Sequence, residues 1–380
     1  MVLLKNDNSD GRGLPLGKPR TMSVFGAHAG PNMAGPNMEF SIGGYPSDSY
    51  DGHCATGGGS GQGSFPYLIT PFNSLSNRAV QDGSMIWWIL NNTYTAPISP
   101  GIPGGGGGFP GGGGFPGGGG GGGIPGIPGN GSTGFAGGGM GGLGGGTAMT
   151  PSIPNYSLNS EVCLAFINSA SGEGSDRKEL SNTEQDAMIN TVAANCNNTI
   201  VIGNFAGPRV LEAWIEHPNI TTVLYSGLLG QESGNAIMDV LYGDVNPSGK
   251  LSHTIAKNAT DYPTTTCMTA ECDFSEGVFL DYRYFQSNNV SVRYPFGHGL
   301  SYTSFSYGGL YVTSTNATAL ASRNPMGVLT LGGQADLFDE ILAVSTTLQN
   351  SGSVAGAEVA QLYISFPEEA GQPLRVLRGF

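Results

Sequence analysis

The most regular pattern of apolar and polar residues lies in the middle of the chain. Short apolar runs bounded by small or polar residues predict buried strands at residues 21–27, 162–168, 199–203, 221–226 and 250–255. Apolar residues at helical spacing predict helices at residues 183–195, 209–217 and 232–242. Strand–helix alternation with short connections predicts an α/β fold with a mostly parallel sheet sandwiched by helices.

A glycine-containing loop follows the predicted strand at residues 162–168. Ligands of such sheets bind at the carboxyl ends of the strands, so this loop lies where a functional site is expected. It carries three charged residues close together, Glu173, Asp176 and Arg177. From position alone, however, a glutamate in a glycine loop is usually just solvated.

The pattern changes near Ala335. Residues 341–348 and 359–366 alternate between apolar and polar positions, with small and polar residues between the two segments. This is typical of the opening hairpin of a β-sandwich module. Two strands cannot close a sandwich and the sequence stops at Phe380, so we expect a truncated module.

A low-complexity tract interrupts the α/β pattern. The chain has 65 glycines and 24 prolines, and much of this excess falls between residues 95 and 150. Glycine contributes no apolar side chain and loses the most backbone entropy on ordering, so the tract is expected to be a disordered insertion. It lacks the strict three-residue period of collagen. The expected organisation is an α/β domain in two parts (1–94 and 151–306), the insertion (95–150), a linker (307–334) and the β-sandwich module (335–380).

The charge balance excludes two classes of partner. With 15 basic and 28 acidic residues, the chain has a formal net charge of −13. A protein this acidic is repelled by nucleic acid and by anionic membrane surfaces, and no apolar stretch is long enough to span a bilayer. We therefore expect neither nucleic-acid nor membrane partners.

Five cysteines are spread along the chain. Cys163 and Cys196 lie in apolar segments and are interpreted as buried structural residues, whereas Cys267 and Cys272 flank a short polar loop and are the expected disulfide. The odd number leaves at least one thiol unpaired. No cluster of cysteine and histidine indicates a metal site.

Glycosylation sequons suggest a secreted, extracellular protein, although the first residues do not form a signal peptide. In addition to Asn130 in the glycine-rich tract, seven sequons are candidate acceptors: Asn91, Asn155, Asn197, Asn219, Asn258, Asn289 and Asn316.

Several ordered segments resemble fungal members of glycoside hydrolase family 3, mainly β-glucosidases. The matching segments are residues 2–6, 59–67, 227–251, 275–302 and 359–380, in the order in which the family has them. In that family a barrel domain carries an aspartate nucleophile, and an α/β sandwich and often a fibronectin-III-like module follow it. The resemblance therefore implies an α/β sandwich domain and the start of a fibronectin-III-like module, with the barrel absent.

The resemblance also implies a role for the glycine loop. A retaining glycosidase needs two carboxyl groups about 5–5.5 Å apart, a nucleophile and a proton donor. Glu173 matches the family's acid/base glutamate, and Asp176 and Arg177 match a following pair that would order the loop. The expected substrates are β-glucosides, including cello-oligosaccharides. The expected reaction needs no cofactor, but it requires a barrel domain for the nucleophile, so the chain alone is expected to be inactive.

The loop departs from the family pattern in ways that leave other functions open. Only Ser175 separates Gly174 from Asp176, where relatives often have a longer insertion with an aromatic residue. Gly58 stands where a tryptophan is common, and Leu229 where a proline is usual. One alternative is a non-catalytic carbohydrate-binding or partner domain. Another is a secreted structural protein in which the glycine-rich tract is the functional part.

Overall fold

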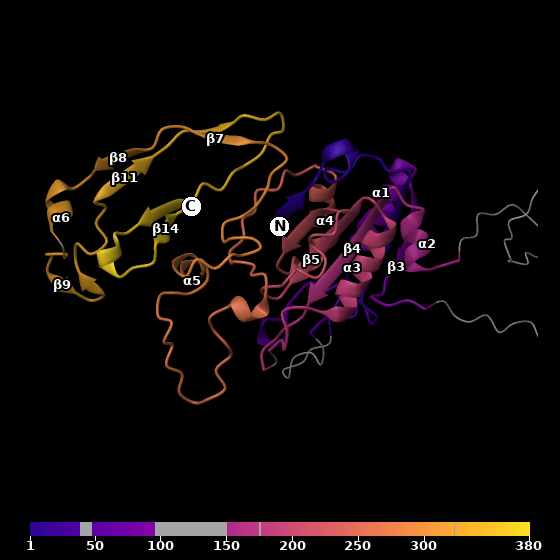
Figure 1. The fold of residues 1–380 in the computed structure, drawn as a ribbon, viewed down its shortest axis with the longest axis horizontal. Coiled ribbons are helices and arrows are strands. Elements are labelled where there is room, and N and C mark those ends of the chain that lie inside the picture. Colours follow the sequence, from indigo (N-terminus) through magenta and orange to yellow (C-terminus); the bar gives the residue numbers. More distant parts are fainter. Residues whose placement is uncertain (39–47, 96–149, 175, 323) are drawn as a thin grey trace, which may run out of the picture. The chain divides into compact units, whose positions relative to one another are not determined.

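A six-stranded mixed sheet organises the part of the chain that precedes residue 300. The computed structural model describes residues 1–38, 48–95, 150–174, 176–322 and 324–380. The strands of this sheet are β1 (Val2–Asn6), β2 (Thr21–Phe25), β3 (Met85–Ile89), β4 (Val162–Ser169), β5 (Thr199–Phe205) and β6 (Ile220–Ser226). Their order across the sheet is β1-β6-β5-β4-β2-β3, and every neighbouring pair is parallel except β1 with β6 (Figure 1). The predicted α/β fold with a mostly parallel sheet is confirmed.

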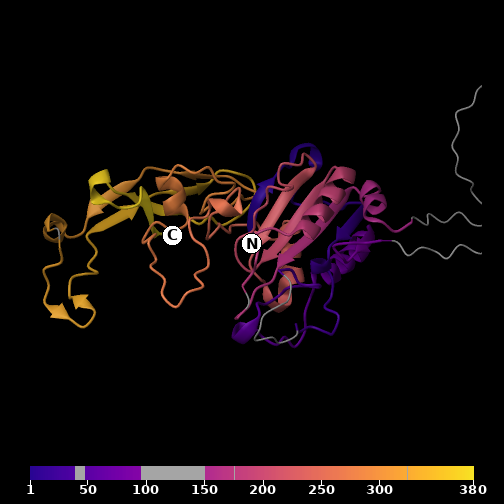
Figure 2. The ribbon, with the colours of Figure 1, turned by 60° about the horizontal axis from the view of Figure 1, so that its bottom comes forward.

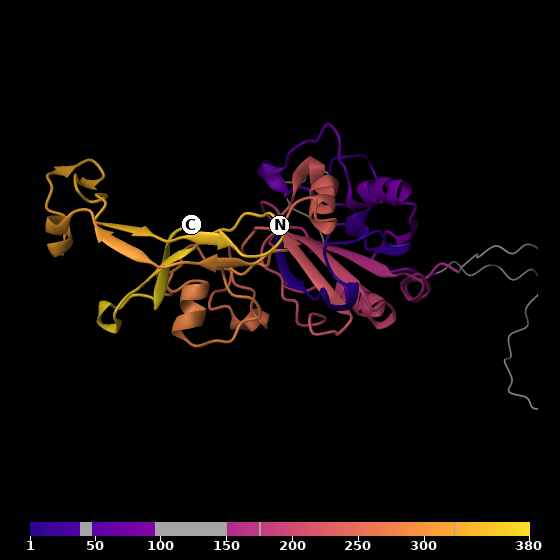
Figure 3. The same cartoon turned by 90° about the horizontal axis from the view of Figure 1, so that it is seen from above.

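Helices cover both faces of the sheet, as Figure 3 shows. They are α1 (Pro71–Asp82), α2 (Ile153–Leu158), α3 (Thr183–Asn195) and α4 (Ser233–Leu241). Consecutive residues of β4 point to opposite faces, so Leu164 joins the core under α1 and α4, whereas Ala165 joins the core under α3. Both faces of the strand are therefore buried, which explains why its sequence is continuously apolar rather than alternating.

The helix starts follow from local sequence. Thr70 caps α1 by accepting a hydrogen bond from the backbone of Asn73, and Pro71 occupies the first turn, where its missing N–H costs nothing. Asn182 caps α3 in the same way by accepting from Gln185. The bounds of α3 coincide with the helix predicted at residues 183–195. None of the helices among the described residues is long and apolar enough to cross a membrane.

Two predicted elements of the α/β domain are wrong. Residues 209–217 form turns instead of a helix, although Trp214 and Ile215 are buried. Pro218 follows directly and disfavours helical backbone at His217. Residues 250–255 are not a strand, because β1 already occupies the edge beside β6 by pairing with it antiparallel. Ile255 makes only an isolated bridge, to Tyr294.

The remaining elements follow the sheet in sequence. They are α5 (Tyr282–Ser287), β7 (Phe305–Tyr307), β8 (Tyr311–Ser314), α6 (Ala317–Ala321), β9 (Leu329–Thr330), β10 (Gly333–Gln334), β11 (Leu342–Ser345), β12 (Leu348–Asn350), β13 (Leu362–Ser365) and β14 (Arg375–Gly379). The strands form four two-stranded antiparallel ladders that do not join the six-stranded sheet (Figure 2).

The hairpin expected between residues 341–348 and 359–366 is also wrong. The first segment contains β11, which pairs with β8, and the second contains β13, which pairs with β14. Strand β8 lies inside the segment that was expected to be a linker. The sequence of a short alternating segment does not show which strand it pairs with. Here both segments pair antiparallel with strands outside the interval between them, since β8 precedes the first segment and β14 follows the second.

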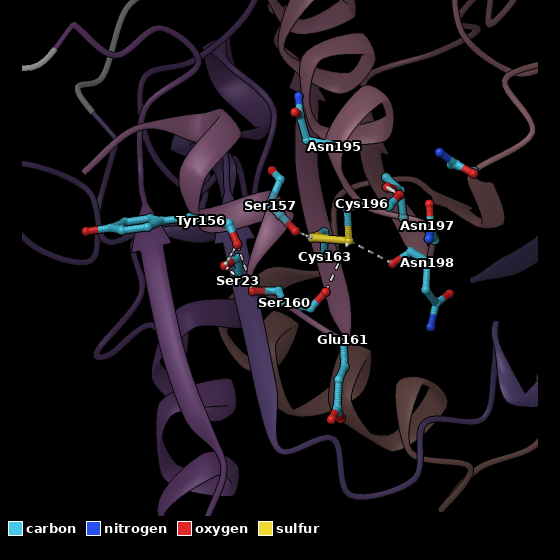
Figure 4. Close-up of a disulfide and its surroundings, with 12 residues drawn as sticks. Ser23, Tyr156, Ser157, Ser160, Glu161, Cys163, Asn195, Cys196, Asn197 and Asn198 are labelled. Carbon is cyan, nitrogen blue, oxygen red and sulfur yellow. Dashed lines mark hydrogen bonds between the residues drawn. A yellow bond between two sulfur atoms is a disulfide. The ribbon is translucent and has the colours of Figure 1, made fainter. Parts of the chain in front are cut away.

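Two disulfides are formed. Cys267 pairs with Cys272, as predicted. Cys163 and Cys196, which were interpreted only as buried structural residues, also pair, and they link the start of β4 to the residue after α3 (Figure 4). Cys54 is the free cysteine; it is buried, and burial raises the pKa of its thiol to about 12.

Candidate active site

The glycine loop lies at a reversal in the strand order. The chain runs from β2 to β3 on one side and then returns to place β4 on the other side of β2. In open α/β sheets the crevice at such a switch point, at the carboxyl ends of the strands, is where ligands bind. The loop after β4 that carries Glu173 is therefore at the expected position.

Ser60 holds the carboxylate of Glu173. The backbone N–H of Ser60 donates to Oε2 of Glu173 at 2.9 Å, and the Ser60 hydroxyl donates to the same oxygen. Glu173 is otherwise exposed to solvent, and no hydrogen bond from the described residues reaches its Oε1. The side chain is thus fixed through one oxygen while the other remains accessible.

Glycines allow the two loops to meet. Gly58 forms a parallel bridge with Gly172, and a Cβ on Gly172 would lie 2.8 Å from the Gly58 backbone. Gly59 has a φ of +79°, and a Cβ there would lie 2.3 Å from the Cβ of Glu173. Only a residue without a side chain fits at this approach. The segment Gly59–Gly61 forms a single 3₁₀ turn.

The electrostatics of Glu173 favour its ionised form. The hydroxyl of Ser60, and then its backbone N–H, lower the pKa of Glu173 because both donate to the carboxylate. No acidic neighbour among the described residues opposes this effect. A general acid needs the opposite shift, so these residues alone hold Glu173 as a base.

Asp176 and Arg177 have separate environments. The Arg177 guanidinium donates to the carbonyl oxygen of Pro208 at 2.6 Å, which ties the loop after β4 to the segment after β5. Burial lowers the pKa of Arg177. Asp176 is exposed, and no ion pair within the described part of the chain joins it to Arg177.

A row of buried polar side chains lies beneath these loops. Asn168 on β4 is in register with Asn204 on β5, and Asn204 is in register with Ser226 on β6. The amide nitrogen of Asn204 donates to Ser226 Oγ at 2.7 Å, so its oxygen faces His28 Nε2 at 2.8 Å. The Nδ1 of His28 accepts from the backbone of Cys54 at 3.1 Å. These partners fix one neutral tautomer of His28.

The same row anchors the segment that leads to Ser60. The side-chain amide of Asn168 donates to the carbonyl oxygens of Tyr50 and Gly52 and accepts from the N–H of Tyr50. His53 Nδ1 contacts the carbonyl oxygen of His28 at 2.8 Å, and the two imidazoles stack at 4.5 Å. Burial lowers the pKa of His53 to about 4. The pKa of His28 is also lowered, by burial and then by the charge of His53.

Two further polar side chains, those of His298 and Glu232, contact residues other than Glu173. His298 contacts the carbonyl oxygen of Leu4 at 3.0 Å and stacks on Tyr294, in keeping with a structural role. Glu232 precedes α4, where its carboxylate accepts from Tyr67 and Asn235.

The sequon asparagines differ in exposure. Four are exposed, namely Asn91, Asn197, Asn258 and Asn289, and three are half-buried, namely Asn155, Asn219 and Asn316. The side-chain nitrogen of Asn219 donates to the Ala193 carbonyl, so a glycan there would require that bond to break. Asn130 lies outside the described residues.

Ser60, His28 and the two strand-end asparagines were not identified as site residues from the sequence. The two asparagines could have been predicted from the sequence, because each is a polar residue near the end of an otherwise apolar run. Ser60 was not, because 113 residues separate it from Glu173.

Comparisons with known proteins identify the family of the chain. The family described as glycosyl hydrolase family 3 C-terminal domain matches residues 1–302. The probable beta-glucosidase D of Aspergillus oryzae is 50% identical over 380 residues, which is the whole chain but 44% of that protein. The probable beta-glucosidase N of Emericella nidulans is 36% identical, with 55% of its length covered.

Solved structures show the same fold. The beta-D-glucoside glucohydrolase from Trichoderma reesei aligns with a TM-score of 0.74 at 32% identity, covering the whole chain and 45% of that protein. A glycoside hydrolase family 3 beta-glucosidase from Neurospora crassa gives a TM-score of 0.73 at 30% identity, covering the whole chain and 48% of that protein. The chain spans roughly half or less of the length of these relatives. It belongs to glycoside hydrolase family 3, of whose members it contains the C-terminal α/β domain.

Proposed function

We propose that this chain supplies the general acid/base of a retaining β-glucoside hydrolase, with Glu173 as the catalytic residue. The observation that carries the proposal is the fixed carboxylate of Glu173, which Ser60 holds at the switch point of the sheet with one oxygen left accessible. The fold brings the carboxylate to the edge where substrates of α/β sheets bind. The names of the relatives supply the substrate class.

The proposed reaction needs a second carboxylate, and we propose that it lies outside this chain. In the first step the nucleophile attacks the anomeric carbon, and the bond from that carbon to the leaving oxygen breaks. Glu173 gives its proton to that oxygen. In the second step Glu173 takes a proton from water, whose oxygen attacks the same carbon and releases the nucleophile. We propose that the nucleophile belongs to a barrel domain, as in the family that the sequence resembles.

The lowered pKa of Glu173 supports this division of roles. Hydrogen bonds from Ser60 stabilise the carboxylate, so the described residues do not keep the proton on Glu173 near neutral pH. A nucleophile carboxylate about 5–5.5 Å away would raise the pKa by like-charge repulsion. Glu173 therefore becomes an acid only when the nucleophile domain is docked, and the chain alone should be inactive.

The test uses a chimera. We would join residues 1–380 to the part of the Aspergillus oryzae relative that the chain does not cover, and measure release of p-nitrophenol from p-nitrophenyl β-D-glucoside. Glu173→Gln should lower kcat/KM by about 10²–10⁴-fold, the usual contribution of a general acid/base. Glu184→Gln is the matched control, because Glu184 is an exposed glutamate in the first turn of α3 that no hydrogen bond among the described residues joins to Ser60, and it should retain activity.

Chemical rescue would identify the role of Glu173. Azide attacks the glycosyl-enzyme intermediate without a general base, so it should restore turnover to the Glu173→Ala chimera and yield β-glucosyl azide. A chimera that is fully active with Glu173→Gln would refute the assignment. Robust turnover by the unfused chain, lost in Glu173→Gln, would refute the need for a second domain.

The finer details are proposed on the same basis. We propose cello-oligosaccharides among the substrates, and secretion, which two disulfides and exposed sequons support. Calorimetric binding of cellobiose to an inactive chimera would instead favour a carbohydrate-binding domain that catalyses nothing.

A further inference from the structure

The contact between Ser60 and Glu173 goes further than holding the loop. Both donors of Ser60 address the same oxygen, Oε2, and neither addresses Oε1. A backbone N–H cannot rotate away as a hydroxyl can, so the direction of approach is set by the main chain. Hydrogen bonds to an ionised acceptor are roughly twice as strong as those between neutral groups. The two oxygens of Glu173 are therefore chemically distinct.

We propose that Ser60 is a positioning residue for the acid/base, which reserves Oε2 for its own two hydrogen bonds and leaves Oε1 as the oxygen that gives and takes the proton. This inference rests on the proposed function of Glu173. It adds Ser60 as a positioning residue and names Oε1 as the oxygen of Glu173 that gives and takes the proton.

The turn that carries Ser60 is built for this contact. The bridge between Gly58 and Gly172 brings the turn against the loop, with the Gly58 N–H donating to the Ser171 carbonyl at 3.0 Å. Beyond Ser60, the N–H of Gln62 donates to the Gly59 carbonyl at 3.0 Å and closes the 3₁₀ turn. The side-chain nitrogen of Gln62 donates to the Met38 carbonyl at 2.7 Å. The turn is thus fixed on both sides of Ser60.

The arrangement suits both halves of the reaction. In the first step the O–H bond at Oε1 breaks as the leaving oxygen takes the proton, and the carboxylate that forms is already paired with Ser60. In the second step water returns a proton to Oε1 without any rotation of the side chain. The same donors favour the carboxylate, which agrees with the lowered pKa of Glu173.

The first experiment titrates Glu173 in the unfused chain. The side-chain carboxyl carbon would be followed by NMR in protein labelled with ¹³C-glutamate, and the resonance assigned by its loss in Glu173→Gln. Ser60→Ala removes the hydroxyl and keeps the N–H, so the midpoint of Glu173 should move to higher pH. Ser60→Thr keeps both donors and should titrate as the wild type does.

Ser64→Ala is the matched control, because Ser64 is an exposed serine four residues further along the same segment. It should leave the midpoint unchanged. Far-UV circular dichroism checks that each variant is folded. A Ser60→Ala midpoint equal to that of the wild type, or no higher than that of Ser64→Ala, would overturn the inference.

The second experiment measures the pH profile of the chimera. Loss of the hydroxyl should shift the alkaline limb of kcat/KM to higher pH, whereas a merely structural Ser60 would lower activity equally at all pH values. The titration needs no catalysis, so the two proposals can fail separately. An inactive chimera with a Ser60-dependent titration would remove the proposed function and leave the contact standing.

Discussion

The disulfide between Cys163 and Cys196 should contribute a large share of the stability of the α/β domain. It joins the start of β4 to the residue after α3 and so encloses the loop that carries Glu173 (Figure 4). Both cysteines are buried in the core between the sheet and α3. A cross-link of this kind acts mainly by restricting the unfolded chain.

The magnitude follows from the length of the closed loop. With a separation of 33 residues, the loop-closure entropy at 25 °C corresponds to about 4 kcal/mol in the free energy of unfolding. The double variant Cys163→Ala/Cys196→Ala should therefore unfold at a midpoint ~8–15 °C lower than the wild type. Thermal unfolding without reductant, followed by circular dichroism, measures this shift.

The second disulfide is an internal control. Cys267 is exposed and Cys272 is half-buried, and their separation of only 5 residues gives about 2 kcal/mol by the same relation. Cys267→Ala/Cys272→Ala should therefore lower the midpoint by about half as much. Reductant breaks both disulfides, so it should bring the wild type close to a variant in which all four of these cysteines are alanine. An equal or larger loss in the control would refute the argument from loop length.

Two further predictions concern buried positions. Gly234→Ala places a Cβ 2.3 Å from a backbone oxygen and should lower the free energy of unfolding, measured in urea, by about 1–3 kcal/mol. Gly227→Ala is the control: no atom lies within 4 Å of its Cβ, so this free energy should hardly change. His53 has a folded pKa of about 4 against 6.5 unfolded, so the unfolded state binds more protons and stability falls as pH drops through that range. The free energy of unfolding should fall by about 3 kcal/mol for this reason. Urea unfolding should show that it falls less between pH 7 and pH 4 in His53→Asn than in the wild type.

The sequence predicted those elements whose local pattern and tertiary role agree. Strands β4, β5 and β6 have apolar runs because both faces are buried, and α3 has a capping asparagine and a buried stripe. Residues 209–217 have the same apolar spacing but no helix. There the side chains of Arg209 and Trp214 both donate hydrogen bonds to Asp186 on α3. A tertiary contact of this kind produces no periodic pattern in the sequence.

The site was predictable only in part for a similar reason. Glu173 became a candidate through the motif that it shares with the family, and the edge of the sheet was predicted from the order of strands and helices. The partners that determine its chemistry come from a turn more than a hundred residues earlier, whose sequence is two glycines around a serine. A glycine in the sequence can indicate that there is no room for a side chain, but it does not identify the neighbouring residue that occupies the space. Only the fold brings Gly59 against Glu173.

The electrostatics of Glu173 explain why a hydrolase of this kind would divide its two carboxyl groups between domains. Ser60 favours the carboxylate, and a nucleophile nearby would favour the protonated acid, so the two carboxyl groups would titrate as a pair. If the proposed function holds, docking of a second domain would both complete the site and favour the protonated form of Glu173. Without Ser60 the acid would hold its proton more tightly and give it up less readily to the leaving oxygen. Under the proposed function, these opposing influences would place the pKa of Glu173 between the two extremes, as a group that acts first as an acid and then as a base requires.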